Sequence, residues 1–278
     1  EFSQNKLQES EWTIGEPSII KLKRKIEEFG ILLKDWPIRI NRGLLTGYND
    51  AYIIDEITRS ELIKKEPKAN NLIKPIIRGR DIERYSHRQS GENVIYIPWH
   101  FPLHNDSSIT AASKAAEAAF AKEYPVIFGH LSQFKDKLSK RNQSETGIRY
   151  EWYAMQRFAA DYIDDFKKEK IIWIELTNKN RFSYSKGEEY VLAGAFLMTG
   201  ESLKYLLAFL NSKLCLFYFS LICNSSGMAT IQWKKFALEK VPIPKLDEAR
   251  QKPFIEIVEK ILTITKDGDY LEDTAKQA

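Results

Sequence analysis

Arginine side chains flank glycine at two short turns within residues 38–85. The first turn holds Arg42-Gly43 and then Thr46-Gly47-Tyr48-Asn49-Asp50, and the second holds Arg78-Gly79-Arg80-Asp81. Apolar residues alternate around both turns, a pattern that predicts strand, tight turn and strand. A guanidinium group is a planar fork of donors that suits bidentate contact with phosphate or guanine. We therefore expect Arg78 and Arg80 to extend outward together and to contact bases or the phosphates beside them.

A plainer interpretation exists for the same two arginines. Charged turns are common on protein surfaces, where Arg78 and Arg80 would pair with Asp81 and Glu83 in a solvated setting. In that case both side chains would serve the fold rather than a partner.

Basic and amide side chains are interleaved with aromatic residues at several other places. Lysine suits phosphate, whereas arginine and asparagine can read base edges, so we expect Lys135 and Lys137 to hold a DNA backbone. Each cluster alone is also typical of ordinary solvated surface. The full set of candidate DNA-binding residues is Arg42, Tyr48, Asn49, Arg78, Arg80, Arg84, Lys135, Lys137, Lys140, Arg141, Asn178, Lys179, Asn180, Arg181, Trp233, Lys234 and Lys235.

Several short sequence motifs occur in a fixed order over roughly residues 12–244. They are RG at 42–43, TGYNDAYIID at 46–55, KPIIRGRDI at 74–82, YP at 124–125, KIIW at 170–173, NSK at 211–213 and VPIP at 241–244. In this order they resemble the TaqI-like C-terminal specificity domain. That domain is the target-recognition part of adenine-specific DNA methyltransferases and of fused restriction-modification enzymes.

The resemblance implies an α+β fold with a mixed or antiparallel sheet core and packed helices. It implies three parts: a linker helix from a missing catalytic domain (1–35), the specificity domain (36–245), and a C-terminal helix and tail (246–278). The expected partners are double-stranded DNA and the methyltransferase domain of the parent polypeptide. S-adenosylmethionine and N6-adenine methylation would belong to that missing domain, with a role in restriction or phage defence. No catalytic residue, cofactor or metal is expected in this chain.

Composition agrees with a folded domain that has room for a nucleic-acid partner. The chain has 278 residues, 43% of them hydrophobic, and its 42 basic and 38 acidic residues give a net charge of +4. That mildly basic balance permits DNA binding without requiring it. Cys215 and Cys223 lie in an apolar run, so we expect reduced core thiols and a cytoplasmic protein. Residues 1–4 do not resemble a signal peptide, and the absence of an initial methionine predicts a piece of a longer polypeptide.

Hydrophobic periodicity predicts the order of secondary structure. Helices are expected at 17–29, 59–65, 109–120, 126–138, 203–222 and 254–265, and a serine- and glycine-rich loop at 224–229. Strands are expected as a hairpin or strand pair in 38–55, as a strand and turn in 72–85, and at 94–99, 170–176, 182–184 and 190–198. The stretch 203–222 has the length of a membrane span, but Lys204 and Lys213 favour a single buried core helix and no membrane.

Sequence motifs for catalysis are lacking. The Asn-Pro-Pro-Tyr motif of adenine methyltransferases, a glycine-rich donor loop, a Walker loop and a nucleophile elbow do not occur in the sequence. His100 and His104 have helical metal-site spacing, but Pro102 between them favours a loop. Two alternatives to DNA recognition stay open. One is an autonomous metal-dependent nuclease using Asp161, Asp165 and Lys167, and the other is a protein–protein scaffold.

Overall fold

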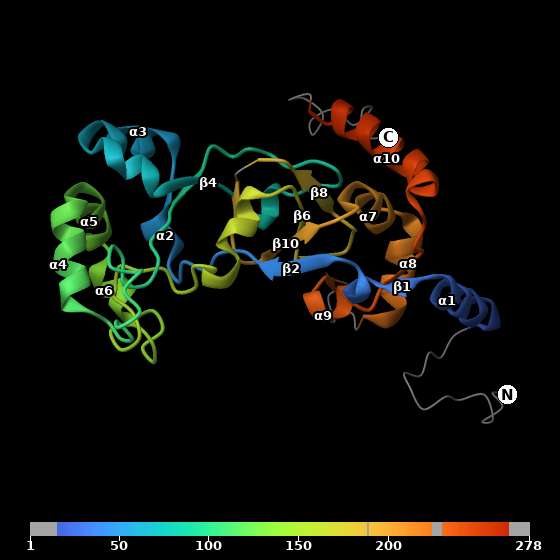
Figure 1. Ribbon diagram of the computed structural model, residues 1–278, viewed down its shortest axis with the longest axis horizontal. Helices are drawn as coiled ribbons and strands as arrows, with labels where there is room; N and C mark the ends of the chain where they lie inside the picture. Colours follow the sequence, from blue (N-terminus) through green and yellow to red (C-terminus); the bar gives the residue numbers. More distant parts are fainter. Residues whose placement is uncertain (1–15, 188, 224–229, 267–278) are drawn as a thin grey trace.

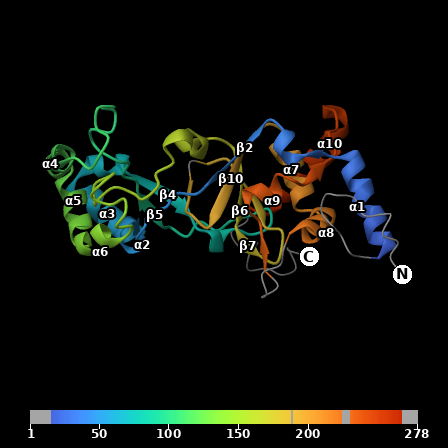
Figure 2. The same cartoon turned by 90° about the horizontal axis from the view of Figure 1, so that it is seen from below.

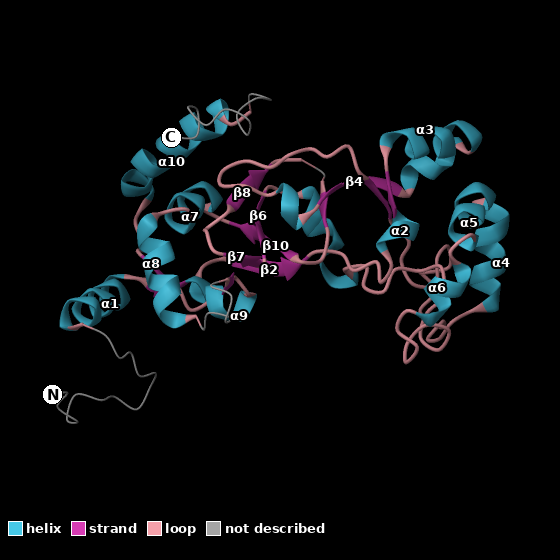
Figure 3. Cartoon of the chain, turned by 180° about the vertical axis from the view of Figure 1, so that it is seen from behind, coloured by secondary structure: helices cyan, strands magenta, loops and turns pink. Residues whose placement is uncertain are grey.

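The computed structural model describes residues 16–187, 189–223 and 230–266. The molecule is elongated, and helices lie at both of its ends with strands between them (Figures 1 and 3). The molecule contains two separate hydrophobic cores. We call the end that carries α2 to α6 the helical lobe, and the end that carries α1 and α7 to α10 the sheet lobe.

A four-stranded antiparallel sheet forms the centre. Its order is β2 (Ile38–Arg42), β10 (Ala195–Gly200), β6 (Lys170–Ile174) and β8 (Phe182–Ser185). Ile172 and Leu197 point into the core of the helical lobe, whereas Trp173 and Phe196 belong to the core of the sheet lobe. Both faces of the sheet are therefore buried, which explains why β6 and β10 are continuous apolar runs rather than alternating ones.

Shorter strands complete the mixed β structure. The helical lobe contains the order β3 (Ile53–Ile54), β5 (Asn93–Ile95), β4 (Ile73–Ile77) and β9 (Tyr190–Val191), in which β4 and β9 are parallel. The other two pairs are β1 (Ile31–Leu32) with β12 (Pro242–Ile243) and β7 (Leu176–Thr177) with β11 (Ile231–Gln232).

Capping side chains set several helix starts. Asp55 accepts from the Thr58 amide before α3, Ser113 from Ala116 before α4, and Asp247 from Arg250 before α10. The α-helices are α1 (Pro17–Phe29), α2 (Asn49–Tyr52), α3 (Glu56–Lys65), α4 (Lys114–Glu123), α5 (Pro125–Ser132), α6 (Lys135–Lys140), α7 (Leu203–Leu210), α8 (Lys213–Ile222), α9 (Lys235–Leu238) and α10 (Glu248–Ile264). Short 3₁₀ turns are η2 (Leu33–Asp35), η3 (Pro67–Asn71), η4 (Gly79–Asp81) and η5 (Ala160–Lys167).

The predicted α+β class is confirmed, as are the helix at 17–29 and the strand at 182–184, whereas the strand predicted at 170–176 is interrupted at Glu175. Cys215 and Cys223 carry free thiols; Cys215 is buried as expected, but Cys223 is only half-buried. The two strands predicted in 38–55 are present as β2 and β3, but they do not form a hairpin. β2 pairs with β10, β3 pairs with β5, and residues 49–52 form α2 between them.

Two predicted long helices are broken. Residues 126–138 divide at Gln133–Phe134 into α5 and α6. Residues 203–222 divide at Asn211 into α7 and α8, which are bent by 70°. The Asn211 side chain donates to the Phe182 carbonyl at 2.8 Å and accepts from its amide at 3.2 Å, while Ser212 caps α8. These bonds stop α7 and start α8 in a new direction.

Other boundaries move because of local chemistry. The helix expected at 109–120 begins at Lys114, after the Ser113 cap, and the helix expected at 254–265 begins at Glu248 with Pro253 inside it. The strand expected at 190–198 is split before Gly194, which has a positive φ of 97°. The loop predicted at 224–229 lies outside the described residues.

The structure tests the membrane and domain predictions only in part. Among the described residues no single helix is long and apolar enough to cross a membrane, while α7 and α8 taken together meet the length and composition criteria as a bent pair. The domain boundaries predicted near residues 35 and 246 stay predictions. Leu33 and Val258 lie on the outer side of these two boundaries, and both pack in the core of the sheet lobe.

Gly43 follows β2 where the chain passes from the sheet towards the helical lobe. A Cβ there would lie 2.4 Å from the Leu192 carbonyl group and 2.5 Å from the Val191 oxygen, all backbone atoms. We expect Gly43→Ala to lower the free energy of unfolding by about 1–3 kcal/mol, measured by urea denaturation.

Gly129 in α5 supplies the matched control, since a Cβ added there would have no described heavy atom within 4 Å. Gly129→Ala should raise stability by about 0.5–1 kcal/mol. Equal effects of the two substitutions would contradict the close approach at Gly43.

Candidate nucleic-acid interface

One end of the four-stranded sheet gathers several of the predicted residues. The register places Phe196 opposite both Arg42 and Trp173, and Trp173 opposite Phe182. Glu175 follows β6 and Arg181 precedes β8, so both lie just beyond this row, whereas Arg42 is the last residue of β2 within it. We call this region the sheet end.

Arg42 and Lys234 converge on one carboxylate at the sheet end. Arg42 Nη2 donates to Glu175 Oε2 at 2.7 Å, and Lys234 Nζ lies 3.9 Å from Glu175 Oε1. The Arg42 guanidinium also sits 5.4 Å from the centre of the Phe196 ring. Cation–π attraction and the ion pair together restrict its orientation.

The second glycine turn packs beside the sheet end. A Cβ on Gly79 would lie 3.1 Å from the Ile174 side chain. Arg78 Nε lies 2.6 Å from Glu92 Oε2, and Arg80 Nη2 lies 3.3 Å from Glu92 Oε1. The Arg80 side chain is 64% exposed and that of Arg78 only 24%.

Glu92 thus holds both guanidinium groups at one point, and their predicted contact with bases or phosphates stays a prediction. The alternative partners were right only in part. Arg80 Nε lies 3.9 Å from Asp81, but Glu83 pairs instead with Arg181, at 3.2 Å.

The segment from Asn178 to Arg181 divides by exposure. Asn178 and Lys179 are exposed, whereas Asn180 is buried and donates to the Leu210 and Ser212 carbonyls at 2.9 Å. Nearby, the exposed Arg84 donates to the Asn211 carbonyl at 2.7 Å.

A second basic group lies on the helical lobe. Lys137 Nζ donates to the Tyr48 hydroxyl at 2.8 Å and lies over the Tyr48 ring, and that hydrogen bond raises the pKa of Lys137. Lys135 pairs with Glu117 at 3.2 Å, and Lys140 is exposed. Asn49 is exposed and accepts a bond from Thr46 Oγ1 at 2.7 Å.

Three predicted contact residues are occupied inside the protein. Arg141 donates through Nη1 and Nη2 to the carbonyls of Thr46, Trp152 and Ala154 and to the Tyr52 hydroxyl. Trp233 is 1% exposed and stacks on Phe219 at 4.0 Å. Together with Asn180 they tie segments of the fold together, so their side chains support the surface from beneath.

The two groups lie on different lobes. In Figure 2, α2 and α6 of the helical lobe and β7 beside the sheet end lie along the lower edge of the view. Exposed basic residues therefore occur on both lobes. The sequence alone did not indicate that Glu175 and Glu92 pair with these arginines, because neither carboxylate is close in sequence to the arginines that it contacts.

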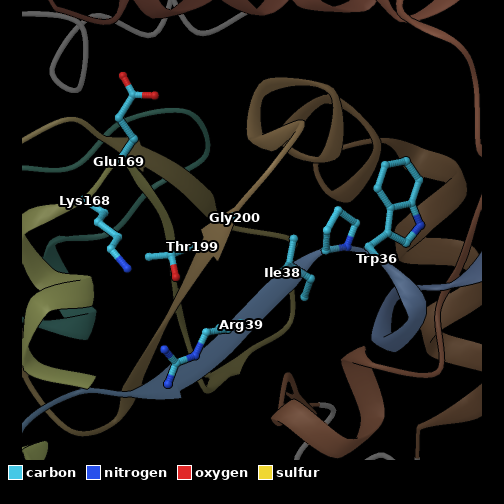
Figure 4. A pocket seen from close by; sticks show the side chains of 8 residues that line it. Trp36, Ile38, Arg39, Lys168, Glu169, Thr199 and Gly200 are labelled. Atoms are coloured by element: carbon cyan, nitrogen blue, oxygen red, sulfur yellow. The ribbon is translucent and has the colours of Figure 1, made fainter. Parts of the chain in front are cut away.

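A pocket of about 430 Å³ lies at the opposite end of the same sheet (Figure 4). It is lined by Trp36, Pro37, Ile38, Arg39, Lys168, Glu169, Thr199 and Gly200. Arg39 Nη1 lies 3.8 Å from the buried Asp165 carboxylate, which Lys168 also contacts at 2.8 Å. Its place, away from the predicted residues, separates it from the basic surface.

The residues of the nuclease alternative do not converge. Asp165 is buried and accepts from Asn41, Asp161 is exposed, and Lys167 pairs with Asp164. Across the described ranges no group of three His, Cys, Asp or Glu side chains is placed to hold a metal. His100 lies in a loop, where its Nδ1 is 3.0 Å from Glu151 Oε1.

The fold and this surface define a target-recognition domain of the kind found in restriction-modification enzymes. The chain belongs to the TaqI-like C-terminal specificity domain family, whose model matches residues 74–243. It is 23% identical over 259 residues to the type II methyltransferase M.MjaIV of Methanocaldococcus jannaschii, covering 91% of this chain and 80% of that protein.

Two solved structures share the fold. The type IIG restriction endonuclease BpuSI has a TM-score of 0.51 at 14% identity, over 87% of this chain. The type IIL restriction-modification enzyme MmeI, solved in complex with DNA, has a TM-score of 0.53 at 11% identity, over 85% of this chain. The chain spans 28% and 29% of those two proteins.

His87 links the second glycine turn to the central sheet. Its Nδ1 lies 2.8 Å from Ser183 Oγ, and burial lowers the pKa of His87 below its usual 6.5, against the opposing effect of Glu189. Burial also lowers the pKa of His130, whose Nε2 donates to the Ala51 carbonyl. Both folded-state imidazoles thus favour the neutral form.

Stability should consequently be full above pH 6.5 and fall as the pH drops through 6.5 towards the lower folded-state pKa values. In that window each histidine lowers the free energy of unfolding by up to about 1.4 kcal/mol for each pH unit of acidification. Urea unfolding at several values between pH 7.5 and 5.5 measures the slope. His87→Gln and His130→Gln should each flatten it, and a wild-type slope in both variants would refute the assignment.

Proposed function

We propose that this chain recognises a short sequence of double-stranded DNA for an adenine-specific DNA methyltransferase of a restriction-modification system. The observation that carries the proposal is membership of the specificity-domain family, joined to exposed basic residues on both lobes. The match to M.MjaIV, a methyltransferase, and to MmeI, which was solved with DNA, supports it.

The two lobes offer different kinds of contact. Lys137 and Lys140 on the helical lobe, and Lys235 at the start of α9, are exposed point charges suited to phosphate. Arg42 and Arg80 at the sheet end carry planar forks suited to base edges in the major groove. Such a division would let the helical lobe hold the duplex while the sheet end reads it.

Methyl transfer itself would belong to a catalytic domain of the parent protein. A target adenine must leave the base stack to be methylated, so the specificity domain would grip the duplex around the extruded base. S-adenosylmethionine would bind to the catalytic domain, since the family match in this chain is to a specificity domain alone. The setting we propose is the cytoplasm, in restriction or defence against phage.

Duplex binding should depend steeply on salt, because each neutralised phosphate adds roughly 0.9 to the slope of log affinity against log salt. Fluorescence anisotropy with a labelled random-sequence duplex at several salt concentrations measures this. Lys137→Met and Lys140→Met should each weaken binding to all sequences and reduce the slope by about one.

The control is Lys252→Met, which removes an exposed lysine on α10 that pairs with Glu256. It should leave the slope unchanged. Salt-independent binding, or an equal loss in all three variants, would count against the proposed surface. Absence of binding at high micromolar protein would favour a protein–protein scaffold.

A further inference from the structure

Arg42 is held from two sides at the sheet end. Its Nη2 donates to Glu175 Oε2 at 2.7 Å, and its guanidinium carbon lies 5.4 Å from the centre of the Phe196 ring. The Arg42 side chain is still 55% exposed, whereas Glu175 is only 14% exposed. The arginine thus reaches solvent while the group that orients it is largely covered.

The supports beneath Arg42 are rigid. Phe196 is 4% exposed and stacks on Trp173 at 5.5 Å, and Trp173 Nε1 donates to the Trp233 carbonyl at 2.8 Å. The Glu175 backbone is fixed as well, because its amide donates to Gly194 at 2.9 Å and its carbonyl accepts from Trp233 at 2.8 Å. Ring and carboxylate therefore form one frame for the guanidinium group.

This frame leaves donors available. A guanidinium group carries five N–H donors in one plane, and the bond to Glu175 uses one of them. Guanine presents two acceptors, O6 and N7, on its major-groove edge, and a bidentate arginine is their commonest partner. A fork that is already oriented loses less side-chain entropy on binding than a free one.

The Glu175 carboxylate also affects which groups can approach Arg42. A phosphate near Arg42 would face the negative charge of Glu175, whereas the neutral edge of a guanine would not. Unfavourable interactions with the wrong partner are a general source of specificity. Arg78 and Arg80 differ, because they share Glu92 and no aromatic ring lies beneath either guanidinium among the described residues.

We propose that Glu175 is a positioning residue for sequence readout. It holds Arg42 against Phe196 so that the guanidinium reads a guanine, and it discourages phosphate from occupying the same place. Lys234 lies 3.9 Å from the other oxygen of the same carboxylate and pairs with it. This inference rests on the proposed function and adds to it the base that is read and the side chain that sets the readout.

The test uses the full chain and a library of random-sequence duplexes. Selection with the wild-type chain defines a motif, and affinities for every single-base-pair variant of that motif give a preference profile. Glu175→Gln should reduce the preference for one G·C pair by about 5- to 150-fold, and raise affinity for random duplex. Arg42→Lys, which keeps the charge but loses the fork, should lose preference at the same pair.

Two controls separate readout from charge. Glu256→Gln removes one carboxylate from α10, where it pairs with Lys252, and should leave the profile unchanged. Lys235→Met, at the exposed lysine that begins α9, should lower the salt slope by about one without altering the profile. Thermal unfolding of each variant checks that it is folded.

The outcomes distinguish the two levels of the proposal. A wild-type chain that enriches no motif defeats the proposed function and this inference with it. A motif that Glu175→Gln leaves unchanged overturns the inference alone. Where Glu175→Gln unfolds the chain, Arg42→Lys decides, since it leaves Glu175 in place, and an unchanged profile in that variant also overturns the inference.

Discussion

The pairing of β10 with β2 on one side and β6 on the other is the constraint on which this structure depends. Side chains along β10 alternate between two cores, with Leu197 facing the helical lobe and Phe196 and Met198 facing the sheet lobe. A shift of one residue in register would exchange these faces and place side chains of the wrong shape in both cores. The same register places Arg42 opposite Phe196, so core packing and the geometry of the surface are set together.

Local patterns predicted the elements whose neighbours in space are also neighbours in sequence. The apolar run KIIWI predicted β6, and α1 ends before Gly30 as predicted. The hairpin prediction is wrong because glycine and asparagine near residue 47 indicate a bend in the chain. They do not indicate which strand pairs with β2. The helix over 203–222 failed because Asn211 bonds to the Phe182 backbone, a tertiary contact that outweighs helical propensity.

The candidate site was predictable by residue type and not by partner. Arginine and lysine beside glycine turns indicated a basic surface, and most of these side chains are on the outside. The carboxylate partner of Arg42 lies far away in the sequence, since Arg42 and Glu175 are 133 residues apart. Only the antiparallel order of the strands brings them together. The same distance hides the interior role of Arg141, whose donors reach carbonyls that a linear pattern cannot assign.

A sheet shared by two cores also limits how such a domain can diversify. A chain cut between the lobes would leave one apolar face of β6 and β10 in water, so the lobes cannot be exchanged as independent cassettes. The ends of the strands are less constrained, because the Arg42 side chain at the last position of β2 is 55% exposed and Glu175 follows the last residue of β6. Variation in what is recognised is therefore least costly at these ends, where a side chain can change while both cores keep their packing.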